Sequence, residues 1–137
     1  MIPVVTTTSK ILYADDDRDD LVLLNESFVS SGLNADVVYV PNGLEAISYI
    51  EHTTGPLPDL VILDLNMPKM NGKETLSYLK THPRYKTIPI IILSTSENKK
   101  EMADCARQGA ASYFVKPIQM AGYAPIVSAC RPYVSKA

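Results

Sequence analysis

Five carboxylates lie within six positions in the segment YADDDRDD, residues 13–20. The apolar run KILYA (10–14) leads into them, so negative charge gathers where a buried strand should end. A further acid, Asp64, stands near the end of another apolar run, DLVILDL (59–65). Carboxylates at close range repel one another, so the cluster needs a cation, a helix start or open water around it.

Five short runs rich in β-branched and aromatic residues indicate strands. They are KILYA (10–14), ADVVYV (35–40), DLVILDL (59–65), PIIILS (89–94) and ASYFV (111–115). Such near-continuous apolar runs are typical of strands that are buried on both faces of a parallel sheet.

Helical patterns of ten to fifteen residues lie between these runs. Three starts pair a capping side chain with an acid three residues later: Asp17 with Asp20, Asn42 with Glu45, and Asn71 with Glu74. Gly32 and Gly109 stand where helices should stop. The expected buried faces are Leu21, Leu24 and Phe28; Leu44, Ile47 and Ile50; Leu76 and Leu79; and Met102, Cys105 and Ala106.

Strands alternating with helices predict an α/β fold, a doubly wound five-stranded parallel sheet. The flavodoxin-like strand order 2-1-3-4-5 is a known order for such sheets, with ligands beyond the carboxyl ends of the first and third strands. Asp15 and Asp16 follow the first strand and Asp64 ends the third. We therefore expect three carboxylates to converge on one crevice.

Magnesium is the cation that suits this crevice, because it takes carboxylate oxygens and keeps sites for water and phosphate. Calcium is the alternative, because Asp15, Asp17, Asp19 and Glu26 match positions 1, 3, 5 and 12 of an EF-hand loop. The loop pattern fails at position 6, where Asp20 replaces the glycine that makes the turn, and residues 21–29 form a helical pattern. We reject the EF-hand.

The remaining acids of this segment have a simpler explanation. Asp17, Asp19 and Asp20 fall in the first turn of the expected helix, where the helix dipole favours negative charge. We expect them to support the helix and to take no part in the site.

Composition sets the frame for function. The chain has 137 residues, 13 basic and 15 acidic, with a net charge of −2, so nothing suggests a nucleic-acid footprint. Cys105 and Cys130 predict two reduced thiols in a cytoplasmic protein. We expect neither a signal peptide nor membrane insertion, but a flexible N-terminus (1–8) and one domain (9–137).

Four blocks, in order, resemble the response-regulator receiver domain, a CheY-like family with a (β/α)5 fold. They are ILYADDD, VILDLNMPKMNG, IIILSTS and GAASYFVKPI, and the resemblance spans about residues 9–134. The run LKTHPRYKTIPIIILSTS is further similar to stand-alone regulators that partner bacterial phytochrome-type histidine kinases.

The resemblance implies a phosphorylation site. Asp64 would accept a phosphoryl group from a sensor histidine kinase as an aspartyl phosphate. Asp16, Asp64 and the backbone carbonyl of Asn66 would hold Mg²⁺, and Asp15 would act mostly through bound water.

It also implies three responding side chains. Lys116 would pair with a phosphoryl oxygen, Ser94 would turn its hydroxyl toward the phosphate, and Tyr113 would move between an exposed and a buried rotamer. Singly, each has a duller explanation: Ser94 or Ser96 caps the next helix, Tyr113 is a half-buried strand aromatic, and Lys116 is a solvated loop lysine.

Two further features come from the family. Asn66 and Ser96 occupy positions that tune how fast the phosphoryl group is lost, because attacking water approaches there. The family also has a cis peptide bond before the residue matching Pro117.

The last segment departs from an ordinary helix, because it contains Gly122, Pro125 and Pro132. We expect the regular helix to begin near Pro125, as a first-turn residue, with Gly122 in a loop or distorted turn before it. In the family the fourth helix, fifth strand and fifth helix form the output surface, so partner choice and homodimer geometry stay open.

The interpretation is a single-domain response regulator of a two-component phosphorelay. It would phosphorylate and dephosphorylate itself without being a turnover enzyme, and would pass its signal to a downstream protein or phosphotransfer partner without binding nucleic acid. A phosphorylation-independent pseudo-receiver is the alternative. A haloacid-dehalogenase-type phosphatase falls behind, because it needs an acid where this chain has Asn66.

Overall fold

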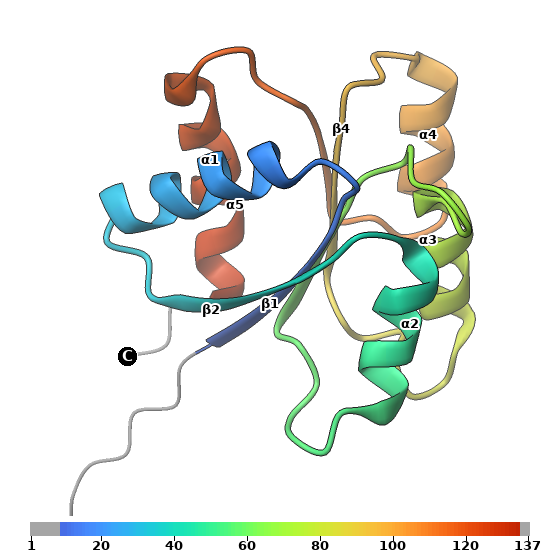
Figure 1. Cartoon of the computed structure of the whole chain (residues 1–137). Helices are drawn as coiled ribbons and strands as arrows, with labels where there is room; N and C mark the ends of the chain where they lie inside the picture. Colours follow the sequence, from blue (N-terminus) through green and yellow to red (C-terminus); the bar gives the residue numbers. More distant parts are fainter. Residues whose placement is uncertain (1–8, 135–137) are drawn as a thin grey trace, which may run out of the picture.

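The structure, a computed structural model, describes residues 9–134. The expected N-terminal segment 1–8 and residues 135–137 of the expected domain lie outside them. Strands and helices alternate along the chain (Figure 1): β1 Ser9–Ala14, α1 Arg18–Ser30, β2 Ala35–Val40, α2 Gly43–His52, β3 Leu60–Leu63, α3 Gly72–Thr81, β4 Ile90–Ser94, α4 Lys99–Arg107, β5 Ser112–Val115, the 3-10 helix η1 Met120–Tyr123 and α5 Ala124–Val134.

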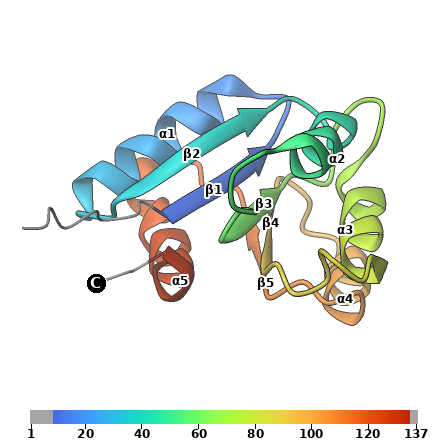
Figure 2. The same ribbon diagram turned by 90° about the horizontal axis from the view of Figure 1, so that it is seen from below.

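The five strands form one parallel sheet in the order β2-β1-β3-β4-β5. Helices α1 and α5 cover one face, and α2, α3 and α4 cover the other (Figure 2). The predicted doubly wound sheet and its strand order are therefore confirmed.

Alternate residues of the strands supply two cores, one under each helical layer. Ile11 and Ile62 pack with the apolar faces of α1 and α5, whereas Leu12 and Leu63 pack with those of α2, α3 and α4. All four side chains are fully buried. Burial of one such side chain contributes roughly 1.5–3 kcal/mol, so the two cores hold the strand ends in place.

The register of β1 and β3 brings the acidic residues together. Ala14 lies opposite Leu63, so the chain leaves both strands at the same edge of the sheet. The amide of Asp64 still donates to the carbonyl of Ala14 at 3.0 Å, and that of Asp15 donates to the carbonyl of Val40 at 3.1 Å. Backbone hydrogen bonds therefore fix both residues where the strands end.

The predicted helix ends are confirmed. Asp17, Asn42 and Asn71 cap α1, α2 and α3, and Asn71 forms a full capping box with Glu74. Gly32 and Gly109 follow α1 and α4 with φ of 70° and 103°, a backbone conformation that favours glycine.

Two residues of the expected buried faces are exposed. In α2, Gly43 and Ala46 are buried with Ile47 and Ile50, whereas Leu44 is 52% exposed. The reason is the close approach of α3: a Cβ on Gly43 would lie 2.1 Å from Thr75 Oγ1, so small residues must face the crossing.

Helix α4 also departs from the expected burial pattern. Its buried side chain is Cys105, whereas Ala106 is exposed and Met102 is half-buried. Because α4 lies toward the β5 edge, it presents a narrower stripe to the core than the sequence pattern indicated.

The last segment folds as expected from its prolines. Pro125 is the second residue of α5, and Gly122 lies in η1 before it. A Cβ on Gly122 would lie 2.5 Å from Pro117 Cβ, so glycine lets η1 pack on that proline. Pro132 lies inside α5, close to its end.

The expectation of a cis peptide bond before Pro117 is wrong for this structure. No cis peptide bond occurs among residues 9–134. The trans form is the lower in energy for a bond before proline by about 0.5–1 kcal/mol, and the chain here adopts it.

Within residues 9–134, no helix has both the length and the apolar character needed to cross a bilayer.

Gly72, the first residue of α3, packs on the backbone that follows β3. A Cβ there would lie 2.2 Å from the carbonyl oxygen of Asp64 and 2.7 Å from Leu65 Cα. Backbone atoms cannot rotate away as a side chain does, so the strand end or the helix would have to shift.

Gly72→Ala is therefore expected to lower the free energy of unfolding by about 2–3 kcal/mol. Urea unfolding followed by far-UV circular dichroism measures it. Gly55→Ala is the matched control, because its Cβ would meet only Lys10 Nζ at 3.9 Å. Equal effects at the two glycines would contradict the packing described.

Candidate functional site

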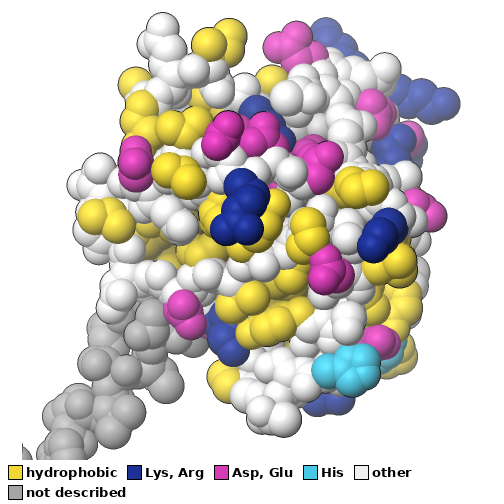
Figure 3. Space-filling view, in the orientation of Figure 1, with side chains coloured by type: hydrophobic (Ala, Val, Ile, Leu, Met, Phe, Trp, Pro, Cys, Tyr) yellow, Lys and Arg dark blue, Asp and Glu magenta, His cyan; other side chains and the backbone are white. Residues whose placement is uncertain are grey.

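Three carboxylates meet at the carboxyl edge of the sheet, as predicted. Asp15 and Asp16 follow β1 and Asp64 follows β3, and one oxygen from each lies within 4.8 Å of the others. Asp15 and Asp64 are buried, whereas Asp16 is exposed. Acidic side chains gather in the space-filling view over the region where β1 passes into α1 (Figure 3).

The surroundings of Asp64 disfavour the ionised form of its carboxyl group. Burial raises its pKa, and the nearby Asp15 carboxylate raises it further. Opposing these effects, the Asn66 amide donates to Asp64 Oδ1 at 3.2 Å and Lys116 Nζ lies 3.1 Å from Oδ2. A further positive charge at this place would therefore favour ionisation of Asp64.

Both oxygens of the Asp15 carboxylate already have donors. Asp17 N–H donates to Oδ1 at 2.9 Å, and the Tyr13 hydroxyl donates to Oδ2 at 2.6 Å. Burial and the charge of Asp15 together raise the pKa of Tyr13, so this phenol remains a donor. The Tyr39 hydroxyl binds the Asp15 carbonyl. The tyrosine contacts have no signal in the sequence patterns.

Lys116 links the carboxylates from the end of β5. Its Nζ lies 2.9 Å from Asp15 Oδ2, 3.1 Å from Asp64 Oδ2 and 2.7 Å from Asp20 Oδ2. Burial alone would lower the pKa of Lys116, but its hydrogen bonds to Asp20 and Asp15 outweigh that effect and raise it. Lys116 is therefore a buried ammonium, and not a solvated loop lysine.

Asp20 is a member of this cluster that the sequence argument assigned to the helix start alone. It lies in the first turn of α1, and its carboxylate turns inward to Lys116. The neighbouring Asp19 is exposed. Nothing in the composition of a first helical turn tells an inward acid from an outward one.

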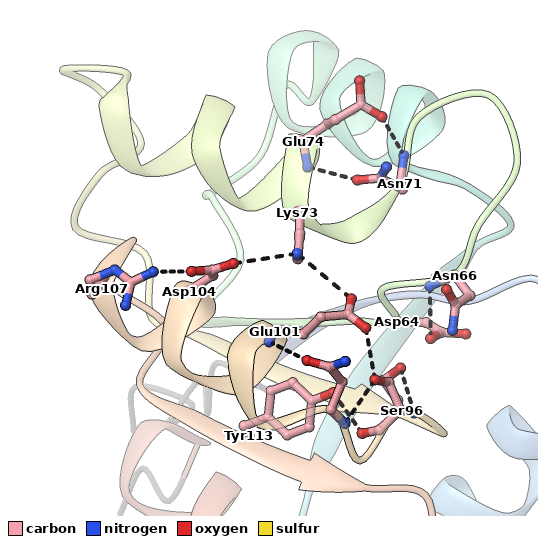
Figure 4. A network of polar contacts seen from close by, with 12 residues as sticks. Asp64, Asn66, Asn71, Lys73, Glu74, Ser96, Glu101, Asp104, Arg107 and Tyr113 are labelled. Carbon is pink, nitrogen blue, oxygen red and sulfur yellow. Dashed lines mark hydrogen bonds and ion pairs between the residues drawn. The ribbon is translucent and has the colours of Figure 1, made fainter.

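Ser94, Ser96 and Tyr113 lie together beside the carboxylates. Ser94 ends β4 and is fully buried, and its Oγ accepts the Ser96 N–H at 3.3 Å. The Tyr113 hydroxyl donates to the Ser96 carbonyl at 2.8 Å, so the ring points inward (Figure 4). The capping alternative for the two serines is wrong, because Asn98 caps α4.

The three carboxylates fit a magnesium ion. Mg²⁺ takes oxygen ligands at about 2.0–2.1 Å, so opposite ligands lie roughly 4.2 Å apart. Oxygens within 4.8 Å of one another need only small side-chain rotations to reach that spacing. Asp16 and Asn66 line an open groove of about 640 Å³ that gives access to the cluster.

The comparisons with known proteins agree with this geometry. The sequence model of the response regulator receiver domain family matches residues 11–124 of this chain. The chain belongs to this family. Receiver domains are phosphorylated by sensor histidine kinases, typically on an aspartate, and bind Mg²⁺ or Mn²⁺ at an acidic pocket.

Curated relatives are similar over most of this receiver domain. Response regulator Rcp1 of Synechocystis sp. is 33% identical over 96 residues, 67% of this chain, and the match spans 65% of the relative's own length. Chemotaxis protein CheY1 of Helicobacter pylori is 30% identical over 108 residues, 79% of this chain and 85% of that protein.

Solved receiver structures superpose over nearly the whole chain. The phosphorylated cyanobacterial phytochrome response regulator RcpA has a TM-score of 0.84 at 30% identity, covering 95% of this chain and 96% of that one. The Mn²⁺-bound form of Rcp1 has a TM-score of 0.82 at 25% identity, covering 94% and 96%. The receiver fold is thus shared.

The raised pKa of Asp64 predicts a pH-dependent effect of Asp64→Asn. The folded protein binds the proton of Asp64 more tightly than the unfolded chain does, so ionised Asp64 lowers stability at neutral pH. The cost disappears below the unfolded pKa, about 3.9. Asp64→Asn should therefore be more stable than wild type at pH 7, with the difference shrinking toward pH 4. Urea unfolding with EDTA measures this, and a less stable variant at pH 7 would contradict it.

The inward position of Asp20 gives a second prediction. Asp20→Asn removes one partner of a largely buried ammonium, so the free energy of unfolding should fall by roughly 1 kcal/mol. Asp19→Asn, one residue earlier and exposed, should change it by less than about 0.5 kcal/mol. Urea midpoints at pH 7 compare the two. An equal loss in both variants would return Asp20 to a purely helical role.

Proposed function

We propose that this receiver domain is a phosphorylation switch in which Asp64 accepts the phosphoryl group of a sensor histidine kinase. The observation that carries the proposal is the cluster itself: Asp64 is buried beside two further carboxylates and within 3.1 Å of the Lys116 ammonium. An acceptor, a cation site and a positive charge are thus gathered at one strand end.

Each side chain has a task that follows from its position. An oxygen of the Asp64 carboxylate attacks phosphorus while the bond from phosphorus to the histidine nitrogen of the kinase breaks, and the electron pair of that bond stays on the nitrogen. Lys116 Nζ moves onto the oxygens of the arriving phosphoryl group as a compact point charge. Asp16, Asp64 and the Asn66 carbonyl would hold Mg²⁺, which supplies neutralisation of phosphoryl charge when bound. Asp15 would act through metal-bound water, since donors already occupy both of its oxygens.

The response would pass through Ser94 and Tyr113. Ser94 turns its hydroxyl toward the phosphoryl group, and the Tyr113 ring is held inward by the Ser96 carbonyl. Phosphorylation shifts the balance between inward and exposed ring positions, and so alters the surface of α4, β5 and α5. That surface would contact a downstream protein, a phosphotransfer partner or a second copy.

The proposal also covers the chemistry, the extent and the cellular location of the domain. It would phosphorylate and dephosphorylate itself without acting as a turnover enzyme, within a receiver domain spanning residues 9–137. The transfer needs kinase and receiver in one compartment, and we propose the cytoplasm, where the free thiols Cys105 and Cys130 stay reduced. The pseudo-receiver remains the alternative.

Intact-mass spectrometry after incubation with acetyl phosphate tests the proposal. Wild type with Mg²⁺ should gain one phosphate, whereas wild type with EDTA and Asp64→Asn with Mg²⁺ should gain none. Asp36→Asn, an exposed acid on β2, is the matched control and should be modified as wild type is. A wild-type protein that gains no phosphate from this donor or from a phosphorylated kinase would favour the pseudo-receiver.

A further inference from the structure

Ser96 is the point where several polar contacts beside Asp64 meet. Its N–H donates to Ser94 Oγ at 3.3 Å, and its carbonyl accepts from the Tyr113 hydroxyl at 2.8 Å. Its hydroxyl donates to Glu101 Oε1 at 2.9 Å and accepts from the Asn98 N–H at 3.3 Å. The orientation of the Ser96 hydroxyl is therefore set by α4 and its cap.

The Glu101 carboxylate is held by a cation from the opposite helix. Lys73 Nζ, on α3, lies 3.7 Å from Glu101 Oε2 and 3.7 Å from Asp104 Oδ2. Asp104 also pairs with Arg107 on its own helix (Figure 4). Lys73 thus ties Glu101 to α3, and Glu101 in turn holds the segment between β4 and α4.

The same pair of charges borders the way to the phosphorylation site. Lys73 and Glu101 line the open groove whose other wall includes Asp16 and Asn66. Asn66 N–H donates to Asp64 Oδ1 at 3.2 Å, so this groove adjoins Asp64. Glu101, on α4, therefore borders the groove that adjoins the proposed phosphorylation site.

We propose that Glu101 is a positioning residue for the loss of the phosphoryl group from Asp64, acting through Ser96. The inference rests on the proposed function. In the step concerned, a water oxygen bonds to phosphorus while the bond from phosphorus to the Asp64 oxygen breaks. The electron pair of that bond stays on the Asp64 carboxylate, and both protons of the water leave with phosphate as H₂PO₄⁻.

The physical reason is the direction of the Ser96 hydroxyl. Because its proton is committed to the Glu101 carboxylate, its oxygen has a remaining lone pair and serves as an acceptor for water. A water that donates to Ser96 can present its own lone pair to phosphorus. Without the carboxylate, the hydroxyl is free to donate to a phosphoryl oxygen, which would hold the phosphorylated state and block the water.

Loss of the carboxylate should therefore lengthen the phosphoryl lifetime. Each protein is phosphorylated with acetyl phosphate and Mg²⁺, the donor is removed, and the phosphorylated fraction is followed by intact mass. Glu101→Gln should slow phosphate loss about fivefold, as expected when a charge-assisted hydrogen bond becomes a neutral one. Asp104→Asn is the matched control: it pairs with Lys73 at the same distance but does not contact Ser96, so its rate should equal that of wild type.

A double variant separates positioning from a general structural effect. Ser96→Ala should also slow phosphate loss, and Glu101→Gln should have no further effect in that background. Equal slowing in Glu101→Gln and Asp104→Asn would assign the effect to the α3–α4 ion pairs and overturn the proposal, as would additive effects of the two changes. These outcomes require a phosphorylated wild type, so failure of phosphorylation itself is a distinct result that concerns the proposed function.

Discussion

The structure depends on burying two carboxylates side by side and on compensating their charge with one ammonium. Asp15 and Asp64 end neighbouring strands whose register leaves them no room to separate. The Lys116 ammonium contacts both carboxylates. The backbone of Lys116 is fixed because its N–H donates to the carbonyl of Ser94, the last residue of β4, at 2.8 Å. Removing Lys116 would leave both carboxylates buried without this cation, whereas removing one carboxylate would leave the other paired with Lys116.

This arrangement also explains why the site can respond to a phosphoryl group. In the structure Lys116 divides its charge among Asp15, Asp20 and Asp64. A dianionic group on Asp64 would compete with these carboxylates for the Lys116 ammonium. Any movement of Lys116 would alter its ion pair with Asp20 on α1. Next to it, Ser96 forms hydrogen bonds with Ser94 of β4, Tyr113 of β5 and Glu101 of α4. Charge at one point thus reaches three elements through direct contacts.

The sheet and the position of its acidic cluster were predictable because local sequence patterns determine them. Apolar runs with helical segments between them predict the sheet, and an acid directly after a strand must lie at its carboxyl edge, as Asp15, Asp16 and Asp64 do. Other features depend on how elements are oriented. The inward turn of Asp20, the exposure of Leu44 and the pairing of Lys73 with Glu101 follow from helix rotation and packing between distant segments. No residue spacing within one helix encodes them.

The central claim is that Asp64 receives the phosphoryl group and that Lys116 transfers its contact to that group. A crystal structure with Mg²⁺ and beryllofluoride, which mimics an aspartyl phosphate, tests it most directly. The account predicts beryllium on an Asp64 oxygen, with Lys116 Nζ on a fluorine and the metal bound by Asp16, Asp64 and the Asn66 carbonyl. Beryllofluoride on another carboxylate, or Lys116 still paired only with Asp15 and Asp20, would contradict it.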